Sequence, residues 1–206
     1  MRWIFDIENP VMQYIIKIFD CMCLSIIWLL LCIPVITAGA STTAMYETMH
    51  RYIRKDEGTL WRTFWGAFRT NFKRSTRIWL VALVVAALLA ADVLVFRTLA
   101  INGHLLGQLY LLILVLCCVA VTWMVYLFAY AARFHGSARD VLRISLLLLV
   151  AHPFKALAVF VLVAVGILLG IMAPGLLTIL PAGVCLLTGM ILEGVFTMHL
   201  PQQEND

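Results

Sequence analysis

Three carboxylic acids in apolar surroundings are the residues of this sequence best suited to chemistry. Asp20, Asp92 and Glu193 each lie within or at the edge of an apolar run of the 206-residue chain. A charge in a hydrocarbon environment is costly, so an acidic group there pairs with a cation, lines a polar path or transfers protons. These three residues are therefore the candidate intramembrane polar sites.

Each carboxylate has a structural explanation beside the functional one. We expect Asp20 to form a local ion pair at the membrane interface and Asp92 to reach water near the end of its apolar run. Glu193 lies deeper, and we expect it to pair with Arg133 or Lys155 from a neighbouring helix. The open alternative for Glu193 is a group that couples the movement of a proton or a substrate.

The other reactive residue types form no catalytic or metal-binding pattern. The five histidines lie at loops or at the ends of apolar runs without ligand spacing. Nearly all of the six cysteines lie inside apolar runs, where a thiol acts as a small hydrophobe. The motifs of P-loop nucleotide hydrolases, α/β-hydrolases and zinc proteases do not occur. We therefore expect no enzymatic activity, no metal site and no cofactor.

The elements that position these residues are expected to be membrane helices. Hydrophobic residues make up 64% of the chain and charged residues 13%, whereas a soluble domain is about 45–50% apolar. This composition predicts an all-α, polytopic membrane protein with a single integral domain over residues 1–206. Runs of about 20 apolar residues can cross a bilayer. Five such spans are expected at roughly 18–38, 78–96, 105–132, 154–172 and 176–198.

Two segments that mix charged and apolar residues lie between the first and second spans and between the third and fourth. They carry most of the positive charge. They are expected to form amphipathic helices at roughly 43–55, 59–75 and 137–150. Lys and Arg concentrate between the first and second spans and between the third and fourth. The positive-inside rule places both segments on the cytoplasmic face of the cell membrane. With five spans, the N-terminus is then expected outside and the C-terminus inside.

The stretch WRTFWGAFRTNFKRSTR, residues 61–77, is both aromatic and basic. On a helical wheel its large aromatic residues form one stripe, and three cations flank that stripe. The stripe consists of Trp61, Phe64, Trp65, Phe68 and Phe72, and the flanking cations are Arg62, Arg69 and Lys73.

This pattern has two compatible interpretations. An interfacial helix would place its aromatics at headgroup depth and its cations toward anionic lipid. A docking helix would use the same residues to bind a protein partner on the cytoplasmic face. We expect no nucleic acid as a partner, because a stacking platform presents aromatic rings to solvent rather than in one apolar stripe.

The sequence resembles the YesL family of bacterial membrane proteins, which occurs mainly in Gram-positive bacteria. The resemblance rests on PVITAGASTTAMY at residues 34–46, on DEGTL, and on F-x-x-A-F-x-x-N-F-K from Phe64 to Lys73. It covers the whole chain, and its specific part is residues 34–79. Members often lie beside genes for carbohydrate uptake, including sugar ABC transporters. The resemblance implies a role near oligosaccharide import and supplies no catalytic residue.

The residues of the motif have mechanical roles in this interpretation. Pro34 ends or kinks the first span, and Gly39 permits a sharp turn. The hydroxyl cluster of Ser41, Thr42 and Thr43 is expected to cap the helix that follows.

The function expected from the sequence is that of a non-enzymatic accessory or assembly component linked to carbohydrate import. Its expected partners are the lipid bilayer and either sugar ABC-transporter components or a second copy of the chain. The alternative is a small secondary transporter or channel that uses the intramembrane carboxylates. The first hypothesis is favoured because the spans contain few polar residues from which a mid-depth path could be built.

Overall fold

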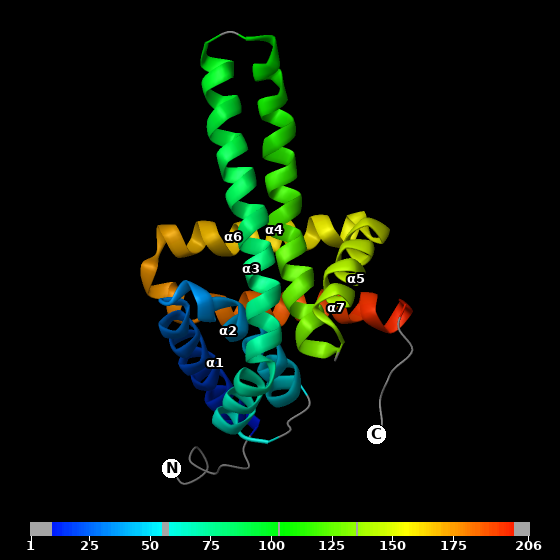
Figure 1. The fold of residues 1–206 in the computed structure, drawn as a ribbon. Coiled ribbons are helices and arrows are strands. Elements are labelled where there is room, and N and C mark those ends of the chain that lie inside the picture. The colour runs from blue at the N-terminus through cyan, green and yellow to red at the C-terminus, as the bar shows by residue number, and fades with distance from the viewer. Residues whose placement is uncertain (1–9, 55–57, 103, 135, 200–206) are drawn as a thin grey trace.

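The computed structural model describes residues 10–54, 58–102, 104–134 and 136–199, and every secondary-structure element in this part of the chain is a helix (Figure 1). Its α-helices are α1 (Pro10–Cys32), α2 (Val35–Thr48), α3 (Leu60–Ile101), α4 (Leu109–Arg133), α5 (Ala138–Ala151), α6 (Pro153–Met172) and α7 (Leu180–His199). A π-helix, η2 (Met49–Arg54), follows α2, and two short 3₁₀ helices are η3 (Leu105–Gln108) and η4 (Pro174–Thr178). The all-α fold predicted from the sequence is confirmed.

A proline corner joins α1 to α2. The helix α1 ends at Cys32, because the residue before a proline is disfavoured in the α-helical conformation. The Thr37 hydroxyl then bonds the carbonyls of Leu31 at 2.5 Å and Pro34 at 2.8 Å. These bonds satisfy carbonyl groups that the end of a helix leaves without a partner. The chain therefore folds back at residues 33–34 rather than continuing to residue 38 as expected.

The helix α2 begins eight residues earlier than the sequence pattern indicated, which corrects the roles assigned to the motif. Gly39 makes no turn: it lies inside α2, where an added Cβ would be 2.4 Å from the Cβ of Trp79. The hydroxyls of Thr42 and Thr43 cap no helix end, since each bonds the carbonyl four residues earlier, at 2.8 and 2.9 Å. Ser41 is likewise buried within α2. These small residues allow α2 and α3 to approach closely.

The helix α3 is a second correction, because it runs without a break over 42 residues. The expected interfacial helix at 59–75 and the expected span at 78–96 are two parts of this one helix. No proline occurs between Leu60 and Ile101, and the single glycine, Gly66, does not interrupt it. At 1.5 Å per residue, α3 is about 63 Å long, twice the thickness of a bilayer core.

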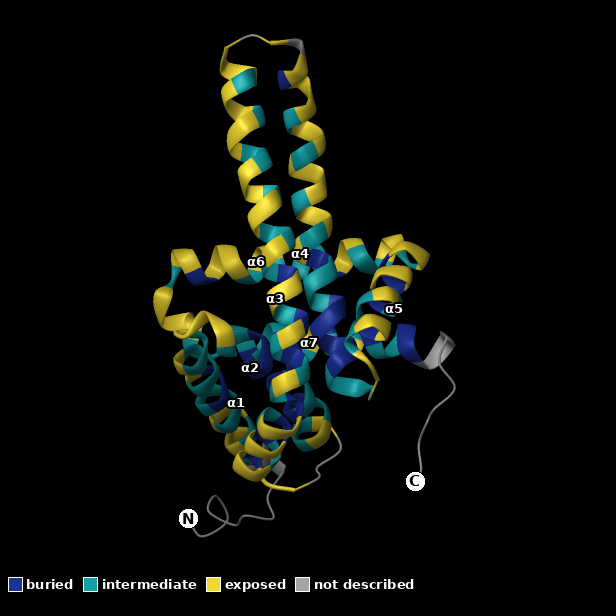
Figure 2. Ribbon diagram, in the orientation of Figure 1, coloured by how far each residue is buried: buried dark blue, intermediate teal, exposed yellow. Residues whose placement is uncertain are grey.

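The distal halves of α3 and α4 form a projecting two-helix arm, residues 83–121 (Figure 2). Its surface is apolar, with Leu88 63% exposed and Leu111 70% exposed. Among the arm residues whose burial is described, only Gly107 is buried, and it lies against Ala100 at the tip. Such an exposed apolar surface is stable in lipid and unfavourable in water.

Four helices in the described part are long and apolar enough to cross a membrane. They contain the segments Ile15–Cys32, Leu60–Ile101, Leu106–Arg133 and Pro153–Met172. The predicted fifth span, 176–198, begins within η4, and the apolar part of α7, Leu180–Phe196, is shorter than the four candidate spans. In Figure 1, α6 and α7 run across the direction of α3 and α4 rather than beside it.

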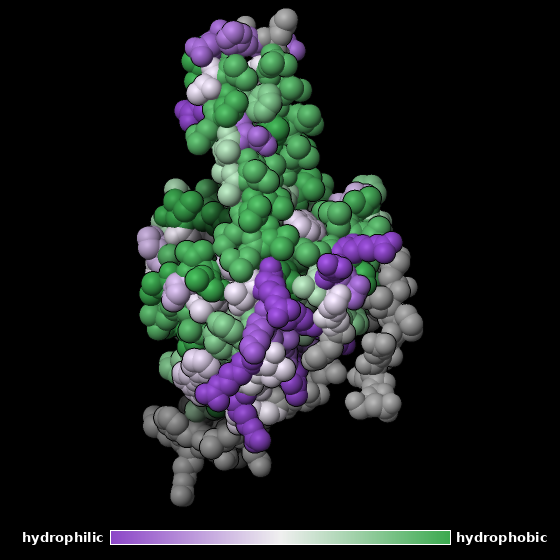
Figure 3. Space-filling view, viewed as in Figure 1, coloured by the Kyte–Doolittle hydropathy of each residue, from purple (hydrophilic) through white to green (hydrophobic). Residues whose placement is uncertain are grey.

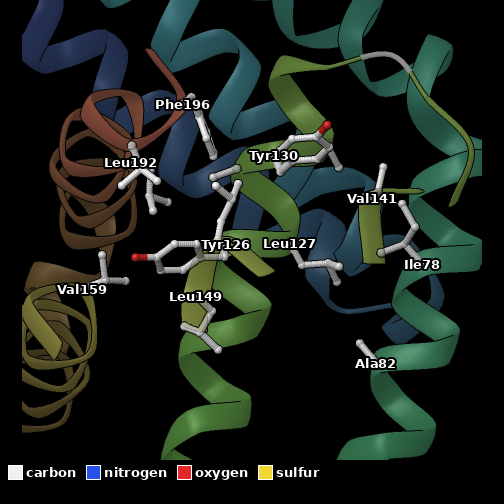
Figure 4. Packing of buried hydrophobic residues seen from close by; sticks show 14 residues of the cluster. Ile78, Ala82, Tyr126, Leu127, Tyr130, Val141, Leu149, Val159, Leu192 and Phe196 are labelled. Atoms are coloured by element: carbon white, nitrogen blue, oxygen red, sulfur yellow. The ribbon is translucent and has the colours of Figure 1, made fainter. Parts of the chain in front are cut away.

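The largest core cluster surrounds the last turns of α4. Tyr126, Leu127 and Tyr130 are buried there, and helices α3, α5, α6 and α7 contribute the side chains around them (Figure 4). A second cluster joins α1, α2 and the first turns of α3, where Leu24 and Phe64 are fully buried. The packed part of the molecule therefore lies beside the first half of α3, and the arm extends away from it.

The contact of Gly39 with Trp79 gives the first prediction. Gly39→Ala should lower the free energy of unfolding by about 1–3 kcal/mol, because the added methyl group overpacks the α2–α3 contact. Gly66→Ala is the matched control: it lies in α3 with open space around it, so it should be neutral or stabilising by up to about 1 kcal/mol. Thermal unfolding in detergent measures both. An unfolding temperature for Gly39→Ala at or above the wild-type value would contradict the contact.

Candidate functional site

An ion-pair junction links α7, η2 and α4 around Glu193. The Glu193 carboxylate lies 2.7 Å from His50 Nδ1 and accepts a hydrogen bond from Arg54. His50 Nε2 in turn faces Arg133 near the end of α4. The side chains of His50 and Glu193 are 17% and 21% exposed. We call His50, Arg54, Arg133 and Glu193 the junction.

The π-helix η2 orients the side chains that form the junction. Its hydrogen bonds join residues five apart, so residues four and five apart lie one above the other. His50 and Arg54 therefore both point toward α7, whereas Tyr52 points away and donates to Asp20 of α1 at 2.5 Å. Short π-helical segments are frequent at functional sites. Here the segment connects α1, α4 and α7.

His50 has contacts at both of its ring nitrogens. An arginine guanidinium has donors and no acceptor, so Arg133 must donate to His50 Nε2. The other ring nitrogen, Nδ1, lies 2.7 Å from the Glu193 carboxylate. The imidazole of His50 therefore lies between the guanidinium of Arg133 and the carboxylate of Glu193.

A second polar chain connects α2, α3 and α4 beside the junction. Asn71 donates to Glu47 at 2.9 Å, and its oxygen accepts from Arg74 at 3.1 Å. Arg74 also donates to the carbonyls of Ala131 and, at 3.0 Å, Phe134. These carbonyls belong to the C-terminal end of α4, where a cation is stabilised by the helix dipole. Arg74 therefore holds α4 against α3.

Two cavities near these groups differ in what they could hold. The cavity beside the junction has a volume of about 30 Å³, enough for roughly one water molecule. A larger cavity of about 270 Å³ lies between α1, α2, α6 and α7. Its polar groups are already bonded: Trp28 donates to Thr42 at 3.1 Å, and Tyr46 bonds Thr188 at 2.9 Å. Burial raises the pKa of the Tyr46 hydroxyl, which stays protonated.

A third cavity of about 670 Å³ lies between α4, α5 and α6, and its lining is almost entirely apolar. A sugar needs several convergent hydrogen-bonding groups in its site. These three cavities therefore suit water or apolar chains better than a carbohydrate. In the described part of the chain, no group of three or more His, Cys, Asp or Glu side chains is placed to hold a metal.

The structure places the three candidate carboxylates in different environments. Glu193 is paired as expected for a buried acid, but its partners are His50 and Arg54 rather than Arg133 or Lys155. Lys155 instead donates to the Gly194 carbonyl at 3.1 Å. Asp20 accepts from Tyr52, as described above. Asp92 lies in the arm at intermediate exposure, with no hydrogen bond or ion pair to the residues described.

The aromatic stripe of α3 is only partly buried. Phe64 is fully buried in the second core cluster, whereas Trp61 and Trp65 are 56% and 38% exposed. Phe68 and Phe72 are half-buried, with ring centroids 5.4 Å apart. The buried face of this half of α3 contains one aromatic residue beside aliphatic, small and polar residues. These residues are Leu60, Phe64, Ala67, Asn71, Ser75 and Ile78.

Sequence reasoning missed His50 and Arg54 as partners of Glu193, and the roles of Asn71 and Arg74. No local signal identifies His50, because its partners lie 83 and 143 residues away in the sequence. For Arg54, the sequence pattern indicates only one of the positive charges of a cytoplasmic segment. Asn71 had a weak signal, since an amide on the buried face of a helix needs a partner.

The junction gives the second prediction. Glu193→Gln and Arg54→Gln should each lower the unfolding temperature, because each leaves a partly buried charge without its partner. The double substitution should cost less than the sum, with a coupling of about 0.5–3 kcal/mol. Arg51→Gln is the control: Arg51 is 53% exposed and pairs with Glu47, so its effect should add to that of Glu193→Gln. Additive effects for Glu193 and Arg54 would exclude the pairing.

Arg74 gives the third prediction. Arg74→Lys keeps the charge and loses the planar fork that reaches several carbonyls at once. We expect amide hydrogen exchange in the last turn of α4 to accelerate roughly tenfold, which corresponds to the loss of about one charged hydrogen bond. Arg77→Lys, on the exposed side of the same helix, should leave that exchange unchanged. Equal exchange in both variants would show that Arg74 does not hold α4.

Comparison with known proteins gives one match. A family described as "Protein of unknown function, DUF624" matches residues 21–93, which is less than half of the chain. The matched segment contains the second half of α1, all of α2 and η2, and α3 as far as residue 93 in the arm. No curated protein and no solved structure matches. DUF624 is the domain carried by YesL-like proteins, so the chain is similar to that family over the helices that build the α2–α3 contact.

Proposed function

We propose that this chain is a YesL-like accessory or assembly component of a carbohydrate importer in the cell membrane and that it performs no catalysis. The long apolar helices and the DUF624 match support a membrane protein. The link to oligosaccharide import comes from the resemblance to YesL proteins.

One observation carries the proposed mode of action: charged and amide groups between the helices are paired with one another, whereas the cations of one face of α3 have no such partner among the described residues. Glu193, Glu47 and Asn71 form contacts between helices. Arg62 and Lys73, by contrast, lie on the exposed side of α3. Figure 3 shows hydrophilic surface gathered over this half of the helix. A component that acts through a surface needs such a face and no internal path.

The proposed orientation places the basic half of α3 in the cytoplasm. This follows from the positive-inside rule, because the Lys and Arg residues of the chain concentrate there and near α5. The hydrogen bond from Tyr52 to Asp20 brings the beginning of α1 to the same end of the molecule. We therefore place the beginning of α1 on the cytoplasmic side, whereas the five-span pattern of the sequence predicts the N-terminus outside. The C-terminal end of α7 is placed on the same side.

A small secondary transporter or channel remains the alternative. It would use Glu193 with His50 as a proton-carrying pair, since a carboxylate and an imidazole in contact can exchange a proton. The accessory function is preferred because the cavity beside this pair admits roughly one water molecule.

Charge reversal on α3 tests the proposal and is the fourth prediction. Arg62→Glu with Arg69→Glu should leave the fold intact and reduce both oligosaccharide uptake and the recovery of importer subunits in mild detergent. Like-charge contacts at an interface cost several kcal/mol. Arg139→Glu with Arg143→Glu on α5 is the matched control, with the same change in net charge at exposed positions. If the α3 pair leaves uptake and recovery unchanged, the proposed docking function is wrong.

A further inference from the structure

Four cations lie along one side of α3. At about 100° per residue, Arg62, Arg69, Lys73 and Arg77 fall within a sector of about 80°. The buried face of the same helix, which includes Phe64, points to the opposite side. Each of the four cations is exposed. We call these four residues the basic line.

The basic line is not used within the described part of the chain. Its four cations make no ion pair or hydrogen bond to the described residues, whereas Arg51, Arg54 and Arg74 are bonded to carboxylates or carbonyls. Gly66, between Arg62 and Arg69, has no atom within 4 Å of an added Cβ. Within the described part of the chain, this face is exposed at all four cations and no acidic side chain pairs with them.

In the orientation proposed above, the direction of the line favours a protein partner over lipid. The apolar part of α3, residues 78–96, is about 28 Å long and matches the core of a bilayer. Because α3 is one rigid helix, the basic line continues along the same axis for about 22 Å. Headgroups extend about 5–8 Å beyond the bilayer core, and charges are screened within about 8 Å at physiological salt. Arg77 and Lys73 can therefore sense anionic lipid, whereas Arg62, about 24 Å from residue 78, cannot. A flat membrane surface cannot cover Arg62 and Arg77 together.

We propose that the basic line binds an acidic helical segment of a partner protein, laid along the cytoplasmic half of α3. This proposal rests on the proposed function and specifies the partner's chemistry: carboxylates repeated at the seven- and four-residue intervals of the basic line. Such a segment pairs every cation along the helix. The exposed rings of Trp61 and Trp65 border the line and offer apolar contact beside the charges.

The first experiment measures whether the line stands clear of the membrane. A ketone-bearing amino acid carrying a nitroxide is placed at Gly66, or at Val84 in the arm, which leaves the native cysteines unchanged. In nanodiscs, the label at position 66 should be relaxed by a water-soluble nickel chelate and the label at position 84 by oxygen. Val84 is 61% exposed in the apolar arm and serves as the lipid-facing control. If the label at position 66 responds like the one at 84, including in nanodiscs with anionic lipid, the partner is lipid and the proposal fails.

The second experiment measures binding to a synthetic probe. The probe is a helical peptide with Glu at the intervals of the line, compared with a peptide of the same composition whose Glu residues are spread around the helix. With the protein in zwitterionic nanodiscs, the matched peptide should bind roughly tenfold tighter, and salt should weaken it. Arg62→Gln with Arg69→Gln should abolish this preference, and Arg139→Gln with Arg143→Gln should preserve it. Equal binding of both peptides, or a preference that survives the α3 substitutions, overturns the proposal.

The peptide experiment, together with the charge reversal on α3, separates this inference from the proposed function. If charge reversal on α3 stops uptake but the matched peptide shows no preference, the docking function holds and the acidic helix is wrong. If the peptide preference follows the α3 cations but uptake is unaffected, the surface binds an acidic helix without a role in import.

Discussion

The continuity of α3 is the constraint on which the rest of the structure depends. One helix of 42 residues contributes to both core clusters, the polar contacts of Asn71, the basic line and half of the arm. Because a helix is stiff along its axis, these parts keep fixed positions relative to one another. Packing against α2 aligns its first half, and the close approach at Gly39 leaves little freedom for sliding or rotation. A break near residue 77 would separate the basic face from the arm.

The interior polar groups explain how the shorter helices are attached to this helix. Arg74 and Asn71 join α3 to the end of α4 and to α2, while the junction joins η2, α4 and α7. Each of these groups would be costly to bury alone, and each is bonded to a partner from another helix. Interior charge therefore specifies which helices are neighbours. The four cations of the basic line lie instead on the exposed side of α3.

Much of the fold could be predicted from local patterns. Apolar runs of membrane length identified α1, α4 and α6, and the Ser137 cap with Asp140 in the first turn marks the beginning of α5. The error at α3 came from treating the change of polarity after Arg77 as the end of a helix. Polarity determines what surrounds a helix, whereas its end is determined by residues that break it, and none occurs there. The prediction of a turn at Gly39 was wrong for a similar reason, since small residues occur both in turns and at close contacts between helices.

The sequence by itself determined that the chain is helical and apolar, and that the cations of residues 62–77 lie along one face, because these properties depend on composition and helical period alone. Only the tertiary structure decided that Glu193 meets His50 and Arg54, and that Arg74 reaches the end of α4. Arg74 and Arg69 are alike in the sequence, yet one is bonded inside the molecule and the other is exposed. The physical reason is that a charged side chain finds its partner across helices that are distant in the chain, and the packing of those helices follows from surface shape and burial that no local pattern records.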